Sequence, residues 1–394
     1  MKQRPIACAS LLALSLGAVG ASQVRTADLQ DDLQKAIQAK LTEVRDAAGY
    51  PGLTAAVAMP DGRVISAATG WGDTAREMPM SSLTRMPAAS VGKTFVAAAI
   101  LQAVDDGKLD LDIPIERSIG REPWFTRLPN AKALTLRLLL SHRSGVPEVY
   151  ENDAFVKAVT ADPERTWRPT DLLAFVFDKK PRSRAGTRFL YTDMNYVIAG
   201  VVFEEAVGRP LFAEIERRLL MPLRLDATVP LERKDWRDVV PGLLDPKNPF
   251  FAVTAPEGET MRNGRFLFGV QAEYAGGGLI SSPRDLVRWA KALWEGRVFS
   301  AARLAEMLDA QPSAGGDRYG LDVGISQSGA GPVYGHDGWA PGYQTVVVYF
   351  ADFKLAAAIQ INSDPMKRYK VRPGDCLGEI VSIPIQQLRK RTRP

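Results

Sequence analysis

The sequence predicts a mixed α/β fold of the α+β type, with an antiparallel sheet built from both ends of the chain. Strand-like runs are confined to about residues 50–90 and 315–365, whereas helical patterns dominate about residues 105–310. No internal repeat and no low-complexity linker separates these parts. One shared sheet, flanked by helices and interrupted by a mostly helical lobe, accounts for this order.

The composition supports a globular domain of this kind. The 394 residues are 46% hydrophobic, 24% charged and 8% aromatic, which excludes disorder, collagen and coiled coil as the main architecture. The length fits one large domain or two intimate ones, and we expect a single domain over residues 22–394. The net charge of +5 comes from six basic residues near the N-terminus and in the tail 389–394, without which it is −1, and we expect the tail to be frayed and solvated. The near-neutral body argues against a nucleic-acid partner.

Residues 1–21 have the pattern of a secretory signal peptide. Two basic residues precede an apolar run over 6–20, and small residues lead up to Ala21. The run is too short for a comfortable membrane span, so we expect cleavage near Ala21, a periplasmic or secreted protein, and no stable membrane insertion afterwards. An uncleaved anchor is the alternative. Loss of Cys8 would leave Cys376 as one thiol without a disulfide partner, and no Cys/His cluster predicts a metal site.

The first elements follow from local patterns. Aliphatic side chains at spacings of three and four predict an amphipathic helix that Gly49 and Pro51 end. Two strand-like runs flank the turn residues 60–62 and predict a hairpin. Ser90 then opens an alanine-rich helix that continues to Val104.

The later elements return from helix to strand. Ser282 is predicted to cap a helix, with Asp285 as the capping-box acid. Three strands and a closing helix are expected after it, over 331–338, 343–349, 355–361 and about 375–388.

Ser90 and Lys93 form the first pair whose spacing suggests chemistry. Side chains three residues apart at a helix start face the same way, and a lysine whose ammonium is destabilised can take a serine proton. The spacing alone is weak, because a capped helix with a surface lysine has the same pattern. The two histidines of the chain are His142 and His336, so any Ser-His-Asp triad must use one of them. We expect His142 to be a satisfied histidine in a loop.

Three short motifs occur in a fixed order: Ser90-x-x-Lys93, Tyr191-x-Asp193 and His336-x-Gly338. In this order they resemble the signatures of the serine β-lactamase and DD-peptidase superfamily, in the class C-like branch that also holds esterases and D-aminopeptidases. The resemblance covers roughly residues 30–365. Lesser phrases of the family are also matched, at 138–145, 186–191, 276–282 and 319–320.

This resemblance implies a role for each matched residue. Ser90 would be the acyl-accepting nucleophile and Lys93 its proton partner. Tyr191 would share that role, and which of the two is the base is left open. His336 would be hydrogen-bonded towards the Tyr191 hydroxyl. Backbone N–H groups of Ser90 and Trp339 would form the oxyanion hole, and no cofactor or metal would be needed.

Two positions depart from the family pattern. Asp193 replaces an asparagine, and an ionised carboxylate can only accept hydrogen bonds, so it would hold the Lys93 ammonium or accept from a substrate amine. Helix capping is its alternative role. Asp337 stands where enzymes for β-lactams and D-Ala-D-Ala usually have a hydroxyl, and it would repel a substrate carboxylate. With Gly338 and Tyr150, these two residues are the candidates for substrate binding.

The sequence therefore predicts an exported serine hydrolase with a small-molecule or peptide substrate. A carboxylesterase or a hydrolase of D-amino-acid amides and peptides ranks first, a DD-carboxypeptidase second and a weak β-lactamase third. The alternative from another class is a non-catalytic, penicillin-binding-like relative, which the intact Ser90, Lys93 and Tyr191 argue against. The oligomeric state and the physiological substrate are not predicted.

Overall fold

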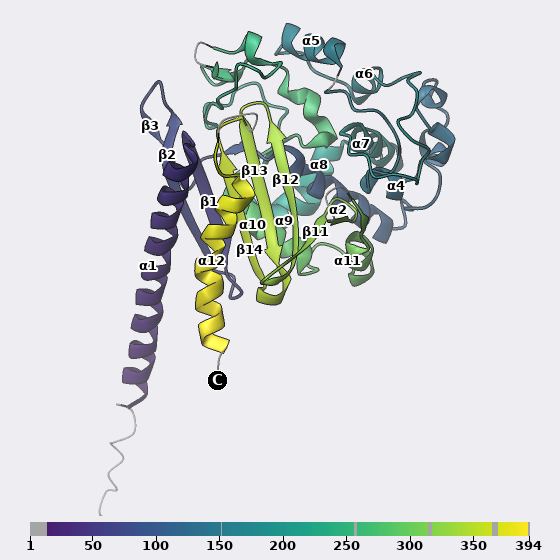
Figure 1. The fold of residues 1–394 in the computed structure, drawn as a ribbon. Helices are drawn as coiled ribbons and strands as arrows, with labels where there is room; N and C mark the ends of the chain where they lie inside the picture. Colours follow the sequence, from purple (N-terminus) through teal and green to yellow (C-terminus); the bar gives the residue numbers. More distant parts are fainter. Residues whose placement is uncertain (1–13, 151, 256–257, 314–316, 365–368, 393–394) are drawn as a thin grey trace, which may run out of the picture.

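A computed structural model describes residues 14–150, 152–255, 258–313, 317–364 and 369–392. Its main feature is a nine-stranded antiparallel sheet in the order β3-β2-β1-β14-β13-β12-β11-β10-β9 (Figure 1). Strands from the two chain ends pair at its centre, where Val57 lies opposite Ala357. This confirms the predicted sheet. Its strands are β1 Gly52–Ala58, β2 Val64–Asp73, β3 Met78–Pro79, β9 Gln311–Pro312, β10 Arg318–Tyr319, β11 Gly324–Ser328, β12 Gly331–Ala340, β13 Tyr343–Phe350 and β14 Leu355–Ile361.

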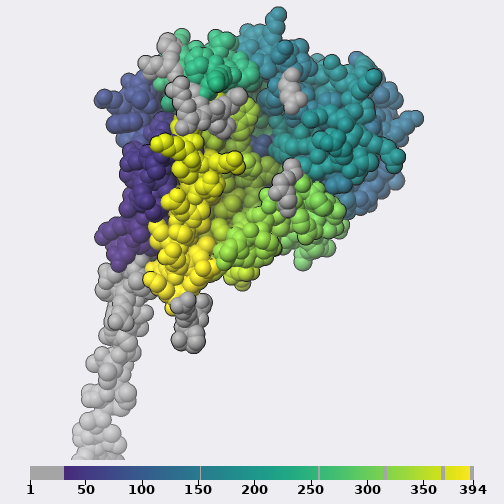
Figure 2. Space-filling view, in the orientation of Figure 1, coloured from purple at the N-terminus to yellow at the C-terminus, as the bar shows by residue number. Residues whose placement is uncertain are grey.

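Two hydrophobic clusters cover the two faces of this sheet. Leu53, Ala55 and Val57 pack into one cluster with α1 (Leu14–Ala48) and α12 (Pro373–Thr392). The alternate residues Ala56 and Ala58 pack into the other, larger cluster beneath the helical lobe. This alternation is the period of two that a strand imposes on its side chains. Figure 2 shows α12 lying alongside α1 on the outer surface.

The helical lobe surrounds α2 (Lys93–Asp105), whose residues from Lys93 to Leu101 are all buried. A helix buried on all sides needs no polar face, which accounts for its alanine-rich sequence. Short strands form two smaller sheets, β4-β8-β5 and β6-β7, which the sequence did not predict because two or three residues are too few to show an alternating pattern. These are β4 Met86–Pro87, β5 Val229–Pro230, β6 Met261–Arg262, β7 Arg265–Phe266 and β8 Leu279–Ser281.

The remaining helices of the lobe are mostly short and joined by long connections. They are α3 Glu116–Ile119, α4 Leu136–Leu140, α5 Asp153–Ala161, α6 Pro169–Leu173, α7 Met194–Val207, α8 Leu211–Ile215, α9 Met221–Leu223, α10 Pro283–Trp294 and α11 Ala301–Leu308. Ser282 caps α10 by accepting from the Asp285 N–H at 3.3 Å. The predicted capping box is wrong, because the Asp285 carboxylate instead accepts from the Ala227 N–H and the Thr228 hydroxyl.

The two terminal helices extend beyond their predicted bounds. The predicted cleavage point near Ala21 lies within α1, and residues 1–13 of the predicted leader lie outside the described residues. At the other end, α12 continues to Thr392, and Arg389 donates to the Gly329 carbonyl oxygen at 2.6 Å. The prediction of a frayed tail is therefore wrong for this part. In the described part of the chain, no helix has the length and hydropathy of a bilayer-crossing segment.

Candidate active site

Ser90 and Lys93 meet at the start of α2. Ser90 lies in the short 3-10 turn η1 (Ala89–Gly92), directly before the helix. The preceding residue Ala89 has φ +49°, which is unfavourable for a side-chain-bearing residue and typical of functional turns. Lys93 Nζ lies 2.8 Å from Ser90 Oγ. The predicted pair is therefore confirmed as a hydrogen-bonded contact.

Lys93 is fully buried, but its ammonium has polar partners on several sides. It lies 2.5 Å from Asp193 Oδ1 and also donates to the Gly276 carbonyl oxygen. Burial lowers the pKa of Lys93, and the nearby Asp193 and Tyr191 outweigh this effect, so that the pKa is raised. Lys93 is thus an ammonium in the resting site.

Asp193 holds this ammonium from the N-cap position of α7, directly before Met194. It therefore occupies the position that the alternative role predicted, but its side chain makes no capping hydrogen bond to that helix. Its backbone N–H donates to Glu148 Oε2 at 2.7 Å. A carboxylate in place of the family's asparagine therefore forms an ion pair with Lys93.

Tyr191 completes the group around the lysine. Its ring centroid lies 5.2 Å from Lys93 Nζ, and its hydroxyl is buried. Burial raises the pKa of Tyr191, although Lys93 opposes the shift. The His142 ring stacks on the Tyr191 ring, with centroids 4.0 Å apart.

His142 is buried and held as a neutral ring. Its Nδ1 lies 3.3 Å from the Thr192 backbone nitrogen and 3.1 Å from Asn195 Nδ2, two donors that fix Nδ1 as the acceptor. Burial and the charge of Lys93 lower its pKa well below the ordinary value. Its Nε2 has no hydrogen-bond partner among the described residues. The prediction of a satisfied histidine is thus correct for Nδ1 only, and the stacking against Tyr191 was not predicted.

His336 lies on β12 with different partners from those expected. Its Nε2 is 2.8 Å from the Tyr319 hydroxyl and 3.3 Å from Asp322 Oδ1, and its ring centroid is 6.3 Å from that of Tyr191. The expected hydrogen bond to the Tyr191 hydroxyl is not formed among the described residues. Burial lowers the pKa of His336, but Asp322 outweighs this effect and the pKa is raised.

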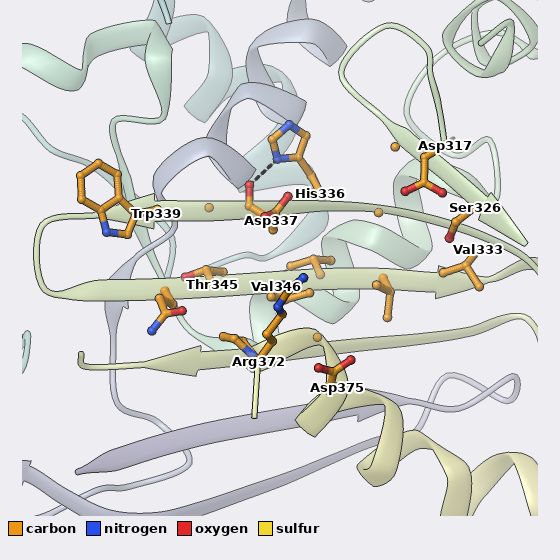
Figure 3. A pocket seen from close by; sticks show the side chains of 18 of the residues that line it. Asp317, Ser326, Val333, His336, Asp337, Trp339, Thr345, Val346, Arg372 and Asp375 are labelled. Atoms are coloured by element: carbon orange, nitrogen blue, oxygen red, sulfur yellow. Dashed lines mark hydrogen bonds between the residues drawn. The ribbon is translucent and has the colours of Figure 1, made fainter. Parts of the chain in front are cut away.

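The next residues of β12 form one wall of the site. A Cβ on Gly338 would lie 2.9 Å from the Ser90 nitrogen, so the strand passes directly over the nucleophile. Asp337 is exposed and lines a groove of about 630 Å³ between β12 and the start of α12, together with Trp339 and Arg372. Ser90, Lys93 and Tyr191 are not among the residues that line this groove. Figure 3 shows these residues, with the dashed bond joining His336 Nδ1 to the Asp337 carbonyl oxygen at 2.6 Å.

Two glutamates near the site were not found from the sequence. Glu148 accepts from the backbone N–H of Asp193, and Glu273 accepts from the Tyr150 hydroxyl. Burial and Asp193 raise the pKa of Glu148 to about 7 and that of Glu273 to about 8. These residues belong to no local motif, so no sequence signal connects them. Among the described residues, no cluster of histidine, cysteine and acidic side chains could hold a metal ion.

Comparisons with known proteins identify the family and the fold of the chain. The Beta-lactamase family model matches residues 35–374. A D-amino acid amidase from Ochrobactrum anthropi SV3, solved with L-phenylalanine amide, is 26% identical with a TM-score of 0.77, covering 91% of this chain and 99% of that one. A D-aminopeptidase of Brucella anthropi is 25% identical over 320 residues, which are 79% of this chain and 56% of that protein.

A local match links the chain to a larger relative. The mitochondrial serine beta-lactamase-like protein LACTB of Bos taurus is 34% identical over 113 residues, which are 29% of this chain. The match covers 20% of that protein. The chain thus spans between a fifth and little more than half of the length of these two curated relatives.

Proposed function

The chain belongs to the β-lactamase family, and we propose that it is an exported serine hydrolase that cleaves amides or peptides of D-amino acids. The hydrolysis would proceed through an acyl-enzyme on Ser90. The observation that carries the proposal is the 2.8 Å contact between Ser90 Oγ and Lys93 Nζ in a site that Asp193 and Tyr191 complete. A non-catalytic relative would have no need of this arrangement.

Acylation begins with attack of Ser90 Oγ on the carbonyl carbon of the substrate. Because Asp193 keeps Lys93 protonated, Lys93 can accept the serine proton only if it passes one of its own to Asp193 in the same step. Tyr191, if first deprotonated, is the alternative acceptor. In either route the carbonyl oxygen gains the negative charge.

The developing oxyanion would be bound by the backbone N–H groups of Ser90 and Trp339. The close approach of β12 to Ser90 at Gly338 supports this placement. As the intermediate collapses, Tyr191 or Lys93 returns the proton to the leaving amine and the C–N bond breaks. Water then attacks the ester carbon and releases the acid, and Ser90 recovers its proton.

The proposed substrate class is supported by two relatives of the chain and by the negative charge of Asp337. The D-amino acid amidase, which the chain covers almost completely, and the D-aminopeptidase both act on D-amino acid derivatives, as their names state. Asp337 disfavours substrates that carry a carboxylate beside the scissile bond, as β-lactams and D-Ala-D-Ala do. We therefore rank D-amino acid amides ahead of β-lactams and D-Ala-D-Ala peptides as substrates.

The deciding experiment is intact-mass spectrometry after brief exposure to a fluorophosphonate, a p-nitrophenyl ester or benzylpenicillin. We expect the fluorophosphonate adduct on the wild type and none on Ser90→Ala. D-Alanine p-nitroanilide and its L-enantiomer are then assayed for turnover, and we expect the D-form to be faster. A stable penicillin adduct with no anilide turnover would favour the penicillin-binding branch instead. A folded wild type that no reagent acylates would exclude the serine mechanism.

A further inference from the structure

Glu273 is the one acidic residue that lines a small apolar pocket beside the nucleophile. It lies in η7 (Val270–Gly276), and the pocket runs from Ala89 and Gly277, next to Ser90, to Phe155 and Phe268. The cavity is about 20 Å³, which is room for little more than one water or methyl group. Glu273 is only partly buried, so its carboxylate can be reached from the site, and its apolar surroundings make a charged or hydrogen-bonding partner favourable.

Only one oxygen of Glu273 has a partner in the part of the chain that the structure describes. The Tyr150 hydroxyl donates to Oε1, while Oε2 makes no hydrogen bond among the described residues. The turn that carries it is held in place. Tyr274, the next residue, has φ +37°, and the Gly276 carbonyl oxygen accepts from Lys93. This strained backbone fixes Glu273 relative to the lysine that contacts the nucleophile.

The other carboxylates near the nucleophile are already occupied. Asp193 is paired with the Lys93 ammonium. Glu148 accepts from the backbone N–H groups of Val149 and Tyr150 through Oε1 and from that of Asp193 through Oε2. Three carboxyl groups therefore surround the one lysine ammonium, and Glu273 is the one with an open oxygen among the described residues. When Glu273 is ionised, a cation in the substrate would pair with it.

We propose that Glu273 binds the α-ammonium group of the substrate's acyl part, with the small apolar pocket beside it taking a methyl-sized side chain. The inference rests on the proposed function, because it assigns the specificity of that same site. It names the ligand as an α-amino acyl compound with an unblocked amine. N-acylated amides and hydroxy acid amides lack the charge that Glu273 would pair with.

The charges around Glu273 set the expected pH dependence of this binding. Burial, Asp193 and Glu148 raise its pKa to about 8, against the opposing effects of Tyr150 and Lys93. At pH 6 the side chain is therefore mostly neutral, and an ammonium must displace its proton to bind. Affinity for an amine should rise with pH towards 8, and it should fall above the pKa of the ligand's own amine.

The test compares two ligands that differ in one group. D-Alanine amide carries an ammonium where (R)-lactamide carries a hydroxyl. Each is used at pH 8, where Glu273 is about half ionised, to slow the fluorophosphonate labelling of Ser90, which reports binding without requiring turnover. In the wild type we expect D-alanine amide to protect at about a 10- to 100-fold lower concentration than (R)-lactamide, as for a hydrogen bond to a charged group.

Glu273→Gln removes the charge while keeping the shape, and Glu205→Gln makes the same change on the exposed surface of α7. The preference for the amine should vanish in the first variant and persist in the second. If D-alanine amide protects Ser90 but is not hydrolysed, the proposed function is wrong and the ammonium site is still supported. If the wild type hydrolyses D-alanine amide but both ligands protect equally, the proposed function is supported and the ammonium site is overturned. A preference that survives Glu273→Gln would also overturn the assignment.

Discussion

Asp322 Oδ1 lies 3.3 Å from His336 Nε2, and both side chains are buried. The hydrogen bonds around them determine the charge of the imidazole. Nδ1 faces the Asp337 carbonyl oxygen at 2.6 Å and must donate to it, because a carbonyl oxygen can only accept. The Tyr319 hydroxyl donates to Asp322 at 3.0 Å, so its oxygen accepts from Nε2. Both ring nitrogens therefore carry protons, and His336 is an imidazolium.

This ion pair preserves a positive charge at a position where the family also has lysine. Asp322 occupies a left-handed backbone conformation, with φ +61°, that favours glycine. The chain tolerates this conformation and gains a buried partner for His336. The positive charge beside the site therefore depends on both His336 and Asp322.

Replacing Asp322 with asparagine should neutralise His336. Burial then dominates, and the pKa of His336 falls below its ordinary value of about 6.5. The Cε1–H resonance of His336 at pH 7 should move from the imidazolium to the imidazole position, and stability should fall by about 3 kcal/mol. In the wild type, the raised pKa stabilises the fold below pH 6.5, and this contribution is lost as pH rises through the folded pKa. A resonance that stays charged in Asp322→Asn would refute the pairing.

Asp193→Asn should move the acidic limb of the profile of kcat/KM against pH to lower pH. Asp193 raises the pKa of both Lys93 and Tyr191, so its removal lowers both values. Whichever group accepts the serine proton then becomes basic at lower pH, and a shift of about one unit or more is expected. The measurement is the turnover of D-alanine p-nitroanilide from pH 5 to 10. A limb that does not move would show that Asp193 does not control the base.

The sequence predicted those parts of the molecule that depend on local spacing. Ser90 and Lys93 lie one helical turn apart, so their contact follows from the helix itself. The hairpin around residues 60–62 and the strand runs near the C-terminus were found for the same reason, since period and turn chemistry are local.

The remaining features depend on tertiary contacts. His336 could be assigned to β12, but its choice of Asp322 over Tyr191 depends on how a neighbouring loop packs. Glu148 and Glu273 are separated by 124 intervening residues, and only the folded lobe brings Glu273 to Tyr150, which Glu148 contacts locally. The number of residues between two positions does not predict whether they meet in the fold, because loops of very different lengths can bring the same two positions together.

Asp337→Thr should improve activity on substrates with a carboxylate on the leaving group. Asp337 is exposed, so its repulsion is that of a charge in water and is worth about 1 kcal/mol at contact distance. We expect kcat/KM for D-alanyl-D-alanine to rise about fivefold, while that for D-alanine amide stays unchanged. Asp309→Asn, at another exposed position, is the control. If the dipeptide gains nothing, Asp337 does not select against carboxylates, and Arg372 in the same groove becomes the group to test.

Gly338→Ala should abolish most of the activity without unfolding the protein. The new Cβ would lie 2.5 Å from the Ala88 carbonyl oxygen and 2.9 Å from the Ser90 nitrogen, closer than real Cβ contacts allow. Because both neighbours are backbone atoms, β12 must move away from η1, and the two N–H groups proposed for the oxyanion would separate. Loss of one such donor costs about 100- to 1,000-fold in kcat. Gly329→Ala, which meets no atom within 4 Å, is the matched control on a nearby turn. Comparable kcat values in the two variants would show that the oxyanion site lies elsewhere.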